Sequence, residues 1–376
     1  MTSDGSGLDP LQNSTVIDLF AGPGGWEQGM RLAGLSTDHV HGFEWDTHAV
    51  DTARAAGLVR HHRDVRDTPP SWFAGVPRSR LGLVASPPCQ SWSSSGRRGG
   101  KDDRANCHRL LDTIASGMDA LPDVAWADER SALVVEPVKW IRDLRPQWVA
   151  MEQVPSVIDI WEHVATVMEQ EWGYRTWCGV VPVAEYGVSQ TRRRAVLVAH
   201  RRRGVHKPAP THSPTPAPPT GSQRILTSPT TTTANNLPHV PAMADVIGWG
   251  YTNRVANTIV AGPNGKSSGA EWGGSTVRRA MYAADATARA TGDLSIWMPK
   301  AAHRLRDGIE SDRIRVSVTE SSLLQGFPAN HPWRGNQSQQ LEQIGNAIPP
   351  PLAAALLREV LGLEPEQSSA PVQSRH

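Results

Sequence analysis

The stretch Thr15-Val-Ile-Asp-Leu-Phe-Ala-Gly-Pro-Gly-Gly-Trp26 decides the fold of this chain. Its first six residues form a short apolar run, which predicts a buried strand. The glycines that follow predict a tight turn, because glycine adopts backbone conformations that other residues avoid. A helical pattern then begins near Trp26 and continues to Leu32. Strand, turn and helix in this order predict the first unit of an α/β domain.

Strand and helix patterns alternate over the first 200 residues. Apolar runs predict further strands at 40–44, 81–86, 148–152 and 194–200, and an amphipathic pattern predicts a helix near 132–144. Strands that alternate with helices favour parallel pairing with crossover connections. We therefore expect an α/β fold with a doubly wound, mostly parallel sheet.

The pattern changes after residue 200. Residues 207–241 are rich in proline, threonine and serine, which predicts a linker or a loose loop. No clear period follows until helical patterns return at 317–325, 338–344 and 352–361, the first with a capping box at Ser317 and Glu320. We expect three parts: an α/β body at 1–204, an irregular part at 205–312, and a helical part at 313–376 that returns to the body.

The composition is that of a globular chain without a strong charge bias. Hydrophobic residues make up 39% and charged residues 20%, and the formal net charge of +1 does not by itself point to nucleic acid. The three cysteines argue against a disulfide framework and a structural zinc site, and suit a reducing compartment. No apolar run reaches the ~20 residues of a membrane span, and the N-terminus lacks the features of a secretion signal. We expect a cytoplasmic protein that binds neither a membrane nor a metal.

A second informative stretch, Pro87-Pro-Cys-Gln90, follows the apolar run 81–86. Both prolines fix φ and lack an N–H group, so the strand must end there. Cys89 therefore leaves the carboxyl edge of the sheet, where open α/β sheets bind ligands. Two interpretations stay open from this motif alone: a cysteine nucleophile, or a cysteine that fills the core.

The glycine turn does not match a dinucleotide-binding fingerprint. Gly22 and Gly24 are followed by Glu27 where the third glycine should stand. The turn still lets a ligand approach the backbone, and the helix after it offers free N–H groups. A ligand without a pyrophosphate suits this loop better than NAD.

Three side chains near the second strand favour an adenosine ligand. Glu44 ends that strand, where a carboxylate binds ribose hydroxyls, and Trp45 follows it as a surface for an adenine ring. Asp64 is a candidate acceptor for the adenine amino group. S-adenosylmethionine is the obvious ligand of this kind, and the alternative is an ordinary turn beside a surface acid.

Six motifs follow one another along the chain. They are the loop 18–26, Pro87-Pro-Cys-Gln90, Met151-Glu-Gln-Val154, Gln190-Thr-Arg-Arg-Arg194, Leu324-Gln-Gly-Phe-Pro328 within 320–328, and Gln343-Ile-Gly-Asn-Ala-Ile-Pro349. In this order they resemble the motifs of the DNA cytosine-5 methyltransferases, over most of the chain outside roughly 205–310. The resemblance implies a Rossmann-like, S-adenosylmethionine-dependent domain and a smaller, irregular target-recognition domain.

The resemblance also implies roles for individual residues. Cys89 would add to carbon 6 of cytosine, and Glu152 would bind ring N3 and the exocyclic amine. Arg194 would bind the cytosine O2 and Arg192 a nearby phosphate, with Gln90 completing the catalytic set. The implied contacts of S-adenosylmethionine are Asp18, Phe20, Ala21, Gly22, Gly24, Gly25, Glu44, Trp45, Asp64, Val65, Pro88, Asn346 and Ala347.

The implied substrate is double-stranded DNA with the target cytosine flipped out of the helix. The loop 91–104 would close over the flipped base, and residues 205–312 would read the sequence. We expect a monomer that acts alone or protects DNA against a cognate restriction enzyme. Three alternatives stay open: methylation of transfer RNA, transfer of a group other than methyl, and a DNA-binding relative without catalysis.

The sequence departs from the family pattern at four positions. Ser86 replaces the usual glycine, Trp92 a phenylalanine, Gln153 an asparagine and Leu323 an arginine. None of these changes removes a catalytic group, so we expect an active enzyme. The longer amide of Gln153 raises the question of how the proline–cysteine loop is held.

Overall fold

A seven-stranded sheet forms the centre of the computed structural model, which describes residues 11, 14–92, 99–121, 124–216, 237–248, 255–259 and 316–364. Its order is β3-β2-β1-β4-β5-β7-β6. The strands are β1 (Thr15–Leu19), β2 (Val40–Glu44), β3 (Arg60–His62), β4 (Leu81–Ala85), β5 (Trp148–Gln153), β6 (Arg175–Pro182) and β7 (Arg193–His200). The first five strands pair in parallel, and β7 runs antiparallel to both of its neighbours. The predicted doubly wound, mostly parallel sheet is confirmed.

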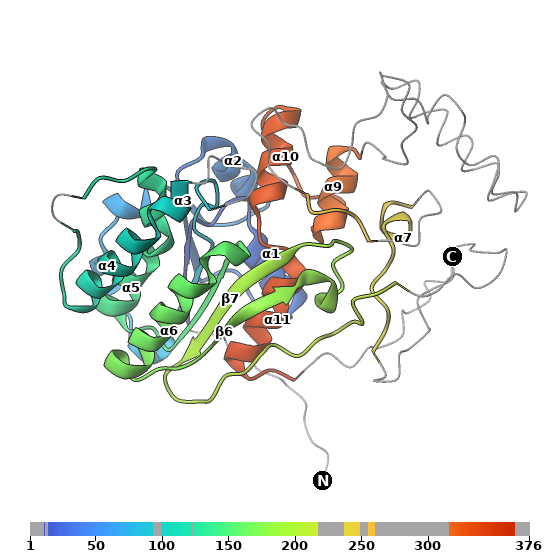
Figure 1. Cartoon of the computed structure of the whole chain (residues 1–376). Coiled ribbons are helices and arrows are strands. Elements are labelled where there is room, and N and C mark those ends of the chain that lie inside the picture. Colours follow the sequence, from blue (N-terminus) through green and yellow to red (C-terminus); the bar gives the residue numbers. More distant parts are fainter. Residues whose placement is uncertain are drawn as a thin grey trace, which may run out of the picture.

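Helices connect the strands and follow them (Figure 1). The α-helices are α1 (Gly25–Leu32), α2 (Thr47–Ala55), α3 (Gly99–Asp102), α4 (Arg104–Ala115), α5 (Glu136–Leu144), α6 (Ile158–Trp172), α7 (Met243–Ile247), α9 (Val318–Gln325), α10 (Gln337–Asn346) and α11 (Pro350–Leu361). Short 3₁₀ helices lie at Val65–Asp67, Pro70–Phe73, Arg78–Arg80, Glu129–Val134, Pro155–Val157 and Val183–Tyr186.

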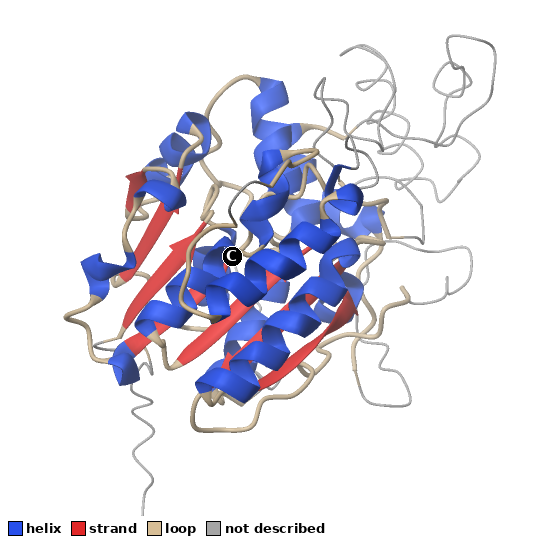
Figure 2. Cartoon of the chain, turned by 60° about the vertical axis from the view of Figure 1, so that its left-hand side comes forward, coloured by secondary structure: helices blue, strands red, loops and turns tan. Residues whose placement is uncertain are grey.

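Two hydrophobic cores lie on opposite faces of the sheet. In β1, Ile17 and Leu19 belong to the core shared with α4, α5 and α6, whereas Val16 belongs to the core shared with α1 and α11. This alternation follows from the two-residue period of a strand. Figure 2 shows the helical layer that covers one face. On the other face α1 and α11 meet at Gly29, where a Cβ would lie 2.5 Å from the Cβ of Ala353.

The antiparallel strand β7 brings a second set of residues to the carboxyl edge of the sheet. Strands β6 and β7 are joined through a short 3₁₀ segment, which is too short for the crossover that parallel pairing requires. The start of β7 therefore lies beside the end of β5, and Gln153 pairs with Ala195. This register places Arg194 at the same edge as Glu152.

Most predicted elements are present, and the structure adds others. The strands and helices expected in 15–44, 81–86, 136–153, 194–200 and 317–361 are confirmed to within a few residues, and the first residues of the helix predicted near 132–144 belong instead to the 3₁₀ helix Glu129–Val134. The capping box is present, since Ser317 Oγ accepts from Glu320 N at 3.2 Å and Glu320 Oε2 accepts from Ser317 N at 2.6 Å. Strands β3 and β6 and helices α2, α4 and α6 come in addition.

Several expectations fall outside the described residues. They concern most of the irregular part at 205–312 and residues 93–98 of the loop expected to close over a base. The division into three parts stays a prediction for the same reason. Within the described part, no helix is long and apolar enough to cross a membrane.

Candidate functional site

A cavity of about 400 Å³ opens at the carboxyl edge of the sheet. Its wall combines the ends of β1, β2, β4 and β5, the start of β7, and helix α10. Thirteen of the residues expected at the site line it: Phe20, Ala21, Gly22, Gly25, Glu44, Trp45, Pro88, Cys89, Gln90, Glu152, Arg194, Asn346 and Ala347. Residues from five of the six motifs, all except the one at 320–328, therefore share one space with Glu44 and Trp45.

The glycine loop forms one side of the cavity. Phe20 (φ 57°) and Gly22 (φ 54°) both have left-handed backbone conformations, which turn the chain sharply between β1 and α1. A Cβ at Gly22 would have no atom within 4 Å, so the loop leaves open space on this side. The absence of a side chain at Gly22 therefore gives the cavity room for a ligand.

Glu44 fixes the adjoining corner. Its carboxylate accepts hydrogen bonds from the backbone N–H groups of Gly22 (2.9 Å), Trp45 (2.8 Å) and Asp46 (2.8 Å). Burial raises the pKa of Glu44, and these N–H donors act in the opposite direction. The ring of Trp45 is 63% exposed beside this carboxylate, which leaves an aromatic surface free at the cavity rim.

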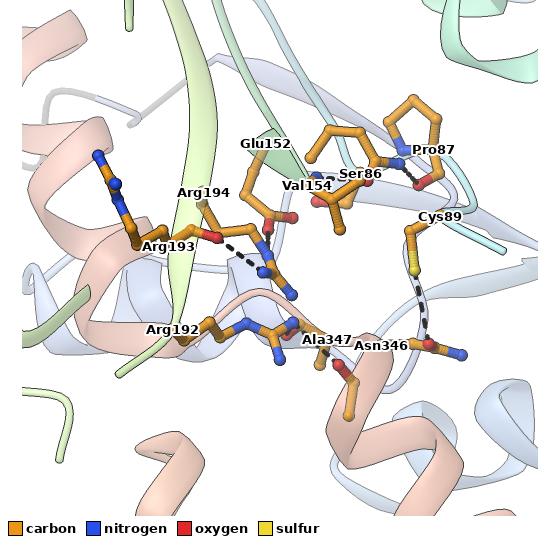
Figure 3. Close-up of polar contacts among 12 residues, drawn as sticks. Ser86, Pro87, Cys89, Glu152, Val154, Arg192, Arg193, Arg194, Asn346 and Ala347 are labelled. Carbon is orange, nitrogen blue, oxygen red and sulfur yellow. Dashed lines mark hydrogen bonds and ion pairs between the residues drawn. The ribbon is translucent and has the colours of Figure 1, made fainter. Parts of the chain in front are cut away.

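The proline–cysteine loop forms the opposite side. Cys89 Sγ lies 4.0 Å from Asn346 Oδ1 of α10 (Figure 3). Burial raises the pKa of the Cys89 thiol, whereas the positive charges of Arg194 and Arg192 lower it. The thiol is thus held in a pocket where two cations favour its ionised form.

Two of the unusual residues hold this loop. Gln153 donates from Nε2 to the Pro87 carbonyl at 2.6 Å and accepts from Val154 N at 2.5 Å. Ser86 Oγ accepts from Trp26 Nε1 at 3.1 Å, which ties the loop to the start of α1. The longer amide therefore reaches the proline–cysteine loop from the end of β5.

Glu152 and Arg194 form an ion pair facing Cys89. Arg194 Nε donates to Glu152 Oε1, and both side chains are almost fully buried. Arg194 Nη1 also donates to the Arg193 carbonyl at 2.8 Å, which fixes the plane of the guanidinium (Figure 3). The site thus holds a thiol, a carboxylate and a guanidinium around one space.

Arg192, which was expected to bind a phosphate, donates instead to backbone carbonyl groups of the protein. Its side chain is buried and donates to the carbonyls of Ile259 and Gly345, both at 2.9 Å, and to that of Ala347 at 3.4 Å. Burial lowers its pKa to about 9, and the charge of Arg194 adds to that effect. In this arrangement Arg192 joins β7 to two other chain segments and does not line the cavity.

Four residues of the expected cofactor set also lie outside the cavity lining. Asp18 is fully buried beside Glu27 and Arg60, and Val65 lies in the core shared with α5. Gly24 has a φ of 108° and packs against Leu58, where a Cβ would collide. Asp64 pairs with Arg66 Nη2 at 2.6 Å, and this hydrogen bond lowers the pKa of the carboxyl group.

The cavity also contains residues that were not expected. Asp46, Thr47 and Ala49 come from the start of α2, and Trp26 from α1, while Gln339, Glu342 and Gln343 come from α10. Those from α2 follow directly after Trp45, so their position along the chain could have revealed them. The face that α10 presents depends on its packing, which a local pattern does not give. No group of three or more metal-binding side chains is found among the described residues.

Comparison with known proteins places these residues in a family. The model of the C-5 cytosine-specific DNA methylases matches residues 14–115 and 124–362. The chain is 26% identical to the type II methyltransferase M1.HphI of Haemophilus parahaemolyticus, covering 92% of this chain and 86% of that protein. It is 27% identical to the type II methyltransferase M.NaeI of Lentzea aerocolonigenes, covering 97% and 80%.

Solved structures support the same fold. A mutant form of DNMT2 from Spodoptera frugiperda superposes with a TM-score of 0.56 at 14% identity, covering 93% of this chain and 99% of that one. A putative DNA modification methyltransferase from an Escherichia coli prophage gives a TM-score of 0.52 at 16% identity, covering 93% and 99%. The match of the family model extends over nearly the whole described sheet and the helices that return to it, and on this ground the chain belongs to the C-5 cytosine-specific DNA methylases, which methylate carbon 5 of cytosine in DNA.

Proposed function

We propose that the chain methylates a flipped cytosine in duplex DNA through a covalent intermediate on Cys89, with S-adenosylmethionine as methyl donor. The observation that carries the proposal is the shared cavity, in which Cys89 and the Glu152–Arg194 pair face the glycine loop and Glu44. The side with Cys89, Glu152 and Arg194 has groups that can bind a pyrimidine. The side with the glycine loop and Glu44 has groups that can bind the nucleoside part of the cofactor.

The residues present fit S-adenosylmethionine. The space beside Gly22 is open, Glu44 is held by three N–H groups where ribose hydroxyls would lie, and Trp45 exposes its ring at the rim. Phe20, Ala21, Gly25, Pro88, Asn346 and Ala347 complete the wall. When bound, this cofactor supplies an electrophilic methyl group attached to a sulfonium.

Cys89 would act as the nucleophile. The ionised sulfur adds to carbon 6 of cytosine, the new S–C bond forms, and the electron pair of the 5,6 double bond becomes available at carbon 5. After carbon 5 has been alkylated, it loses its proton to a base, the electrons re-form the double bond, and the S–C bond breaks. Arg194 favours the ionised thiol through its charge, and this effect acts against burial.

Glu152 and Arg194 would bind the pyrimidine ring. Glu152 would bind ring N3 and share a proton with it, which would prevent negative charge from accumulating on the ring during addition. The Arg194 guanidinium would donate to O2, and its bond to the Arg193 carbonyl orients it for that contact. Gln90 lies in the same cavity wall and would border the base.

The proposed substrate is double-stranded DNA, and the resemblance to type II methyltransferases favours a cognate restriction enzyme as biological partner. We propose that residues 205–312 read the target sequence and that the chain acts as a monomer. The described segment 255–259 supports the first point, because Ile259 is fastened to the catalytic body by Arg192.

The test is methyl transfer from labelled S-adenosylmethionine to unmethylated genomic DNA and, in parallel, to total transfer RNA. Cys89→Ser should lower transfer to DNA by about 10³-fold or more, and Glu152→Gln should also impair it strongly. Bisulfite sequencing would then give the target site. Full activity of Cys89→Ser would refute the covalent mechanism, and preferential labelling of transfer RNA would refute the substrate.

A further inference from the structure

Arg60 is a buried cation directly beneath the glycine loop. It belongs to β3, and its side chain has no exposed surface. The side chain crosses β2 at Gly42, where any Cβ would overlap with Arg60 Nη1. A glycine on the neighbouring strand therefore makes the path that leads the guanidinium to the loop.

The three nitrogen atoms of this guanidinium have three different partners. Nε donates to the Gly22 carbonyl and Nη2 to the Ala21 carbonyl, both at 3.2 Å. Nη1 donates to Glu27 Oε1 at 2.5 Å, and Glu27 lies in the first turn of α1. The contact with Glu27 alone would be enough for an ion pair. The two contacts with the carbonyls of Ala21 and Gly22 hold the loop itself.

Arg60 acts together with Glu44 on the same residue. The Gly22 N–H donates to Glu44 Oε2, and the Gly22 carbonyl accepts from Arg60 Nε. Both polar backbone groups of Gly22 are thus bound by charged side chains. The left-handed conformations of Phe20 and Gly22 are therefore fixed from both sides of the loop.

The surrounding charges explain why the guanidinium can stay buried. Glu27 provides one negative charge, and Asp18 is packed nearby. Burial raises the pKa of Asp18 well above its ordinary value, and the charge of Glu27 raises it further. The raised pKa disfavours the charged form of Asp18, so the charge of Arg60 is balanced mainly by Glu27, and Glu44 makes a smaller contribution.

We propose that Arg60 is a positioning residue for the cofactor, which sets the conformation of Ala21 and Gly22 through their carbonyl groups. The inference rests on the proposed cofactor site, because it gives the loop a ligand. Arg60 does not line the cavity and acts on the ligand only through the loop.

The test compares three variants of the full-length protein: Arg60→Met, the double variant Glu27→Met/Arg60→Met, and the control Arg54→Met. Arg54 is an exposed arginine that donates to the Arg60 carbonyl at 2.9 Å. The control therefore makes the same substitution at an arginine that contacts Arg60 and not the glycine loop. The measurements are the Kd of S-adenosylhomocysteine by calorimetry, the Tm without ligand, and the KM and kcat for methyl transfer.

For Arg60→Met we expect the Kd and the KM for S-adenosylmethionine to rise about 10- to 100-fold, with a much smaller change in kcat. The variant also leaves Glu27 buried without its partner, so its Tm should fall. The double variant removes both charges and should regain thermal stability, because removing a buried ion pair costs less stability than leaving one buried charge without its partner. Its Kd should stay raised, because the two loop carbonyls still lack their donor.

Recovery of the wild-type Kd in the double variant would overturn the proposal, since Arg60 would then only neutralise Glu27. A wild-type Kd in Arg60→Met, or an equal loss in Arg54→Met, would overturn it as well. If the wild-type protein itself binds no S-adenosylhomocysteine, the cofactor site is refuted and the role of Arg60 with it. If Arg60→Met does not fold, the double variant decides alone.

Discussion

The amide of Gln153 gives the sharpest test of how the nucleophile is positioned. Gln153 is 2% exposed. Its amide donates to the Pro87 carbonyl at 2.6 Å, two residues before Cys89, and accepts from the Val154 N–H at 2.5 Å, at the end of β5. In Gln153→Ala the buried Pro87 carbonyl and the part-buried Val154 N–H both lose the amide that pairs them. The proline–cysteine loop then has one fewer attachment to the sheet.

The expected size of the effect follows from these two contacts. A buried backbone group that loses its partner costs about 1–3 kcal/mol, a cost that applies in full to the Pro87 carbonyl and only in part to the Val154 N–H. If the loop relaxes to avoid this cost, Cys89 moves, and a displacement of about 1 Å can lower the rate by about 10²-fold. We therefore expect kcat to fall by about 10- to 100-fold, with a smaller change in the KM for the cofactor.

The assay is single-turnover methyl transfer from labelled S-adenosylmethionine to duplex DNA. Gln153→Asn is the graded variant, because a side chain one methylene shorter reaches one partner but not both. The matched control is Gln340→Ala, which removes a half-buried glutamine of α10 that donates to the Gly335 carbonyl at 2.8 Å and does not line the cavity. Its rate should stay within about threefold of the wild type, as most surface substitutions have small effects.

A wild-type rate for Gln153→Ala would refute this reasoning, since the loop would then be held by contacts elsewhere. An equal loss in the Gln340→Ala control would refute it too. A fall in Tm without a fall in kcat would show that Gln153 stabilises the fold and does not position the cysteine.

Three further predictions concern packing, pH and DNA binding. Gly29→Val should destabilise the protein by about 1–3 kcal/mol, seen as a lower Tm, because a Cβ at this position already crowds Ala353 across the α1–α11 contact. The kcat/KM for DNA should rise with pH on the acid side of the Cys89 pKa, by up to about tenfold per pH unit, because burial raises that pKa and so keeps the thiol protonated at lower pH; a profile that is flat up to pH 9 would contradict this. Arg192→Met should lower the Tm but leave the slope of log K for DNA against log salt unchanged, because its guanidinium binds protein carbonyls; a slope reduced by about 0.9 would show a phosphate contact.

The parts of the fold that the sequence predicted have strong local patterns. The run 15–20 is apolar and ends in glycines, and Ser317 stands three residues before Glu320 as a capping box requires. Strand β3 has the sequence Arg60-His-His62 and gains its place only by pairing with β2, so no local pattern predicts it. Strand β6 is an edge strand and mostly half-buried, which removes the apolar signal as well.

The candidate site divides in a similar way. Motifs predicted that Cys89, Glu152 and Glu44 would meet, because each stands at the carboxyl end of a strand in a parallel sheet. They did not predict the partners of long side chains. Arg192 donates to carbonyls that lie 67 and 153 residues away in the sequence. Glu27 was noted in the sequence only because it stands where a dinucleotide-binding loop has its third glycine, and in the structure it pairs with Arg60 of β3.

The hydrogen bonds between the catalytic body and the segment 255–259 use main-chain atoms of that segment. Thr191 N donates to the Ala256 carbonyl and Ala256 N to the Ser189 carbonyl, both at 2.9 Å, while Ile259 uses its carbonyl toward Arg192 and its N–H toward Gln190 Oε1 at 3.1 Å. Backbone groups are the same in every amino acid except for the missing N–H of proline. These hydrogen bonds therefore depend on the path of the chain, whereas the buried side chains of Ala256 and Ile259 add apolar contacts to the cluster that contains Leu324 of α9 and Leu341 and Ile344 of α10. Any sequence at this junction must therefore keep two small or apolar side chains there.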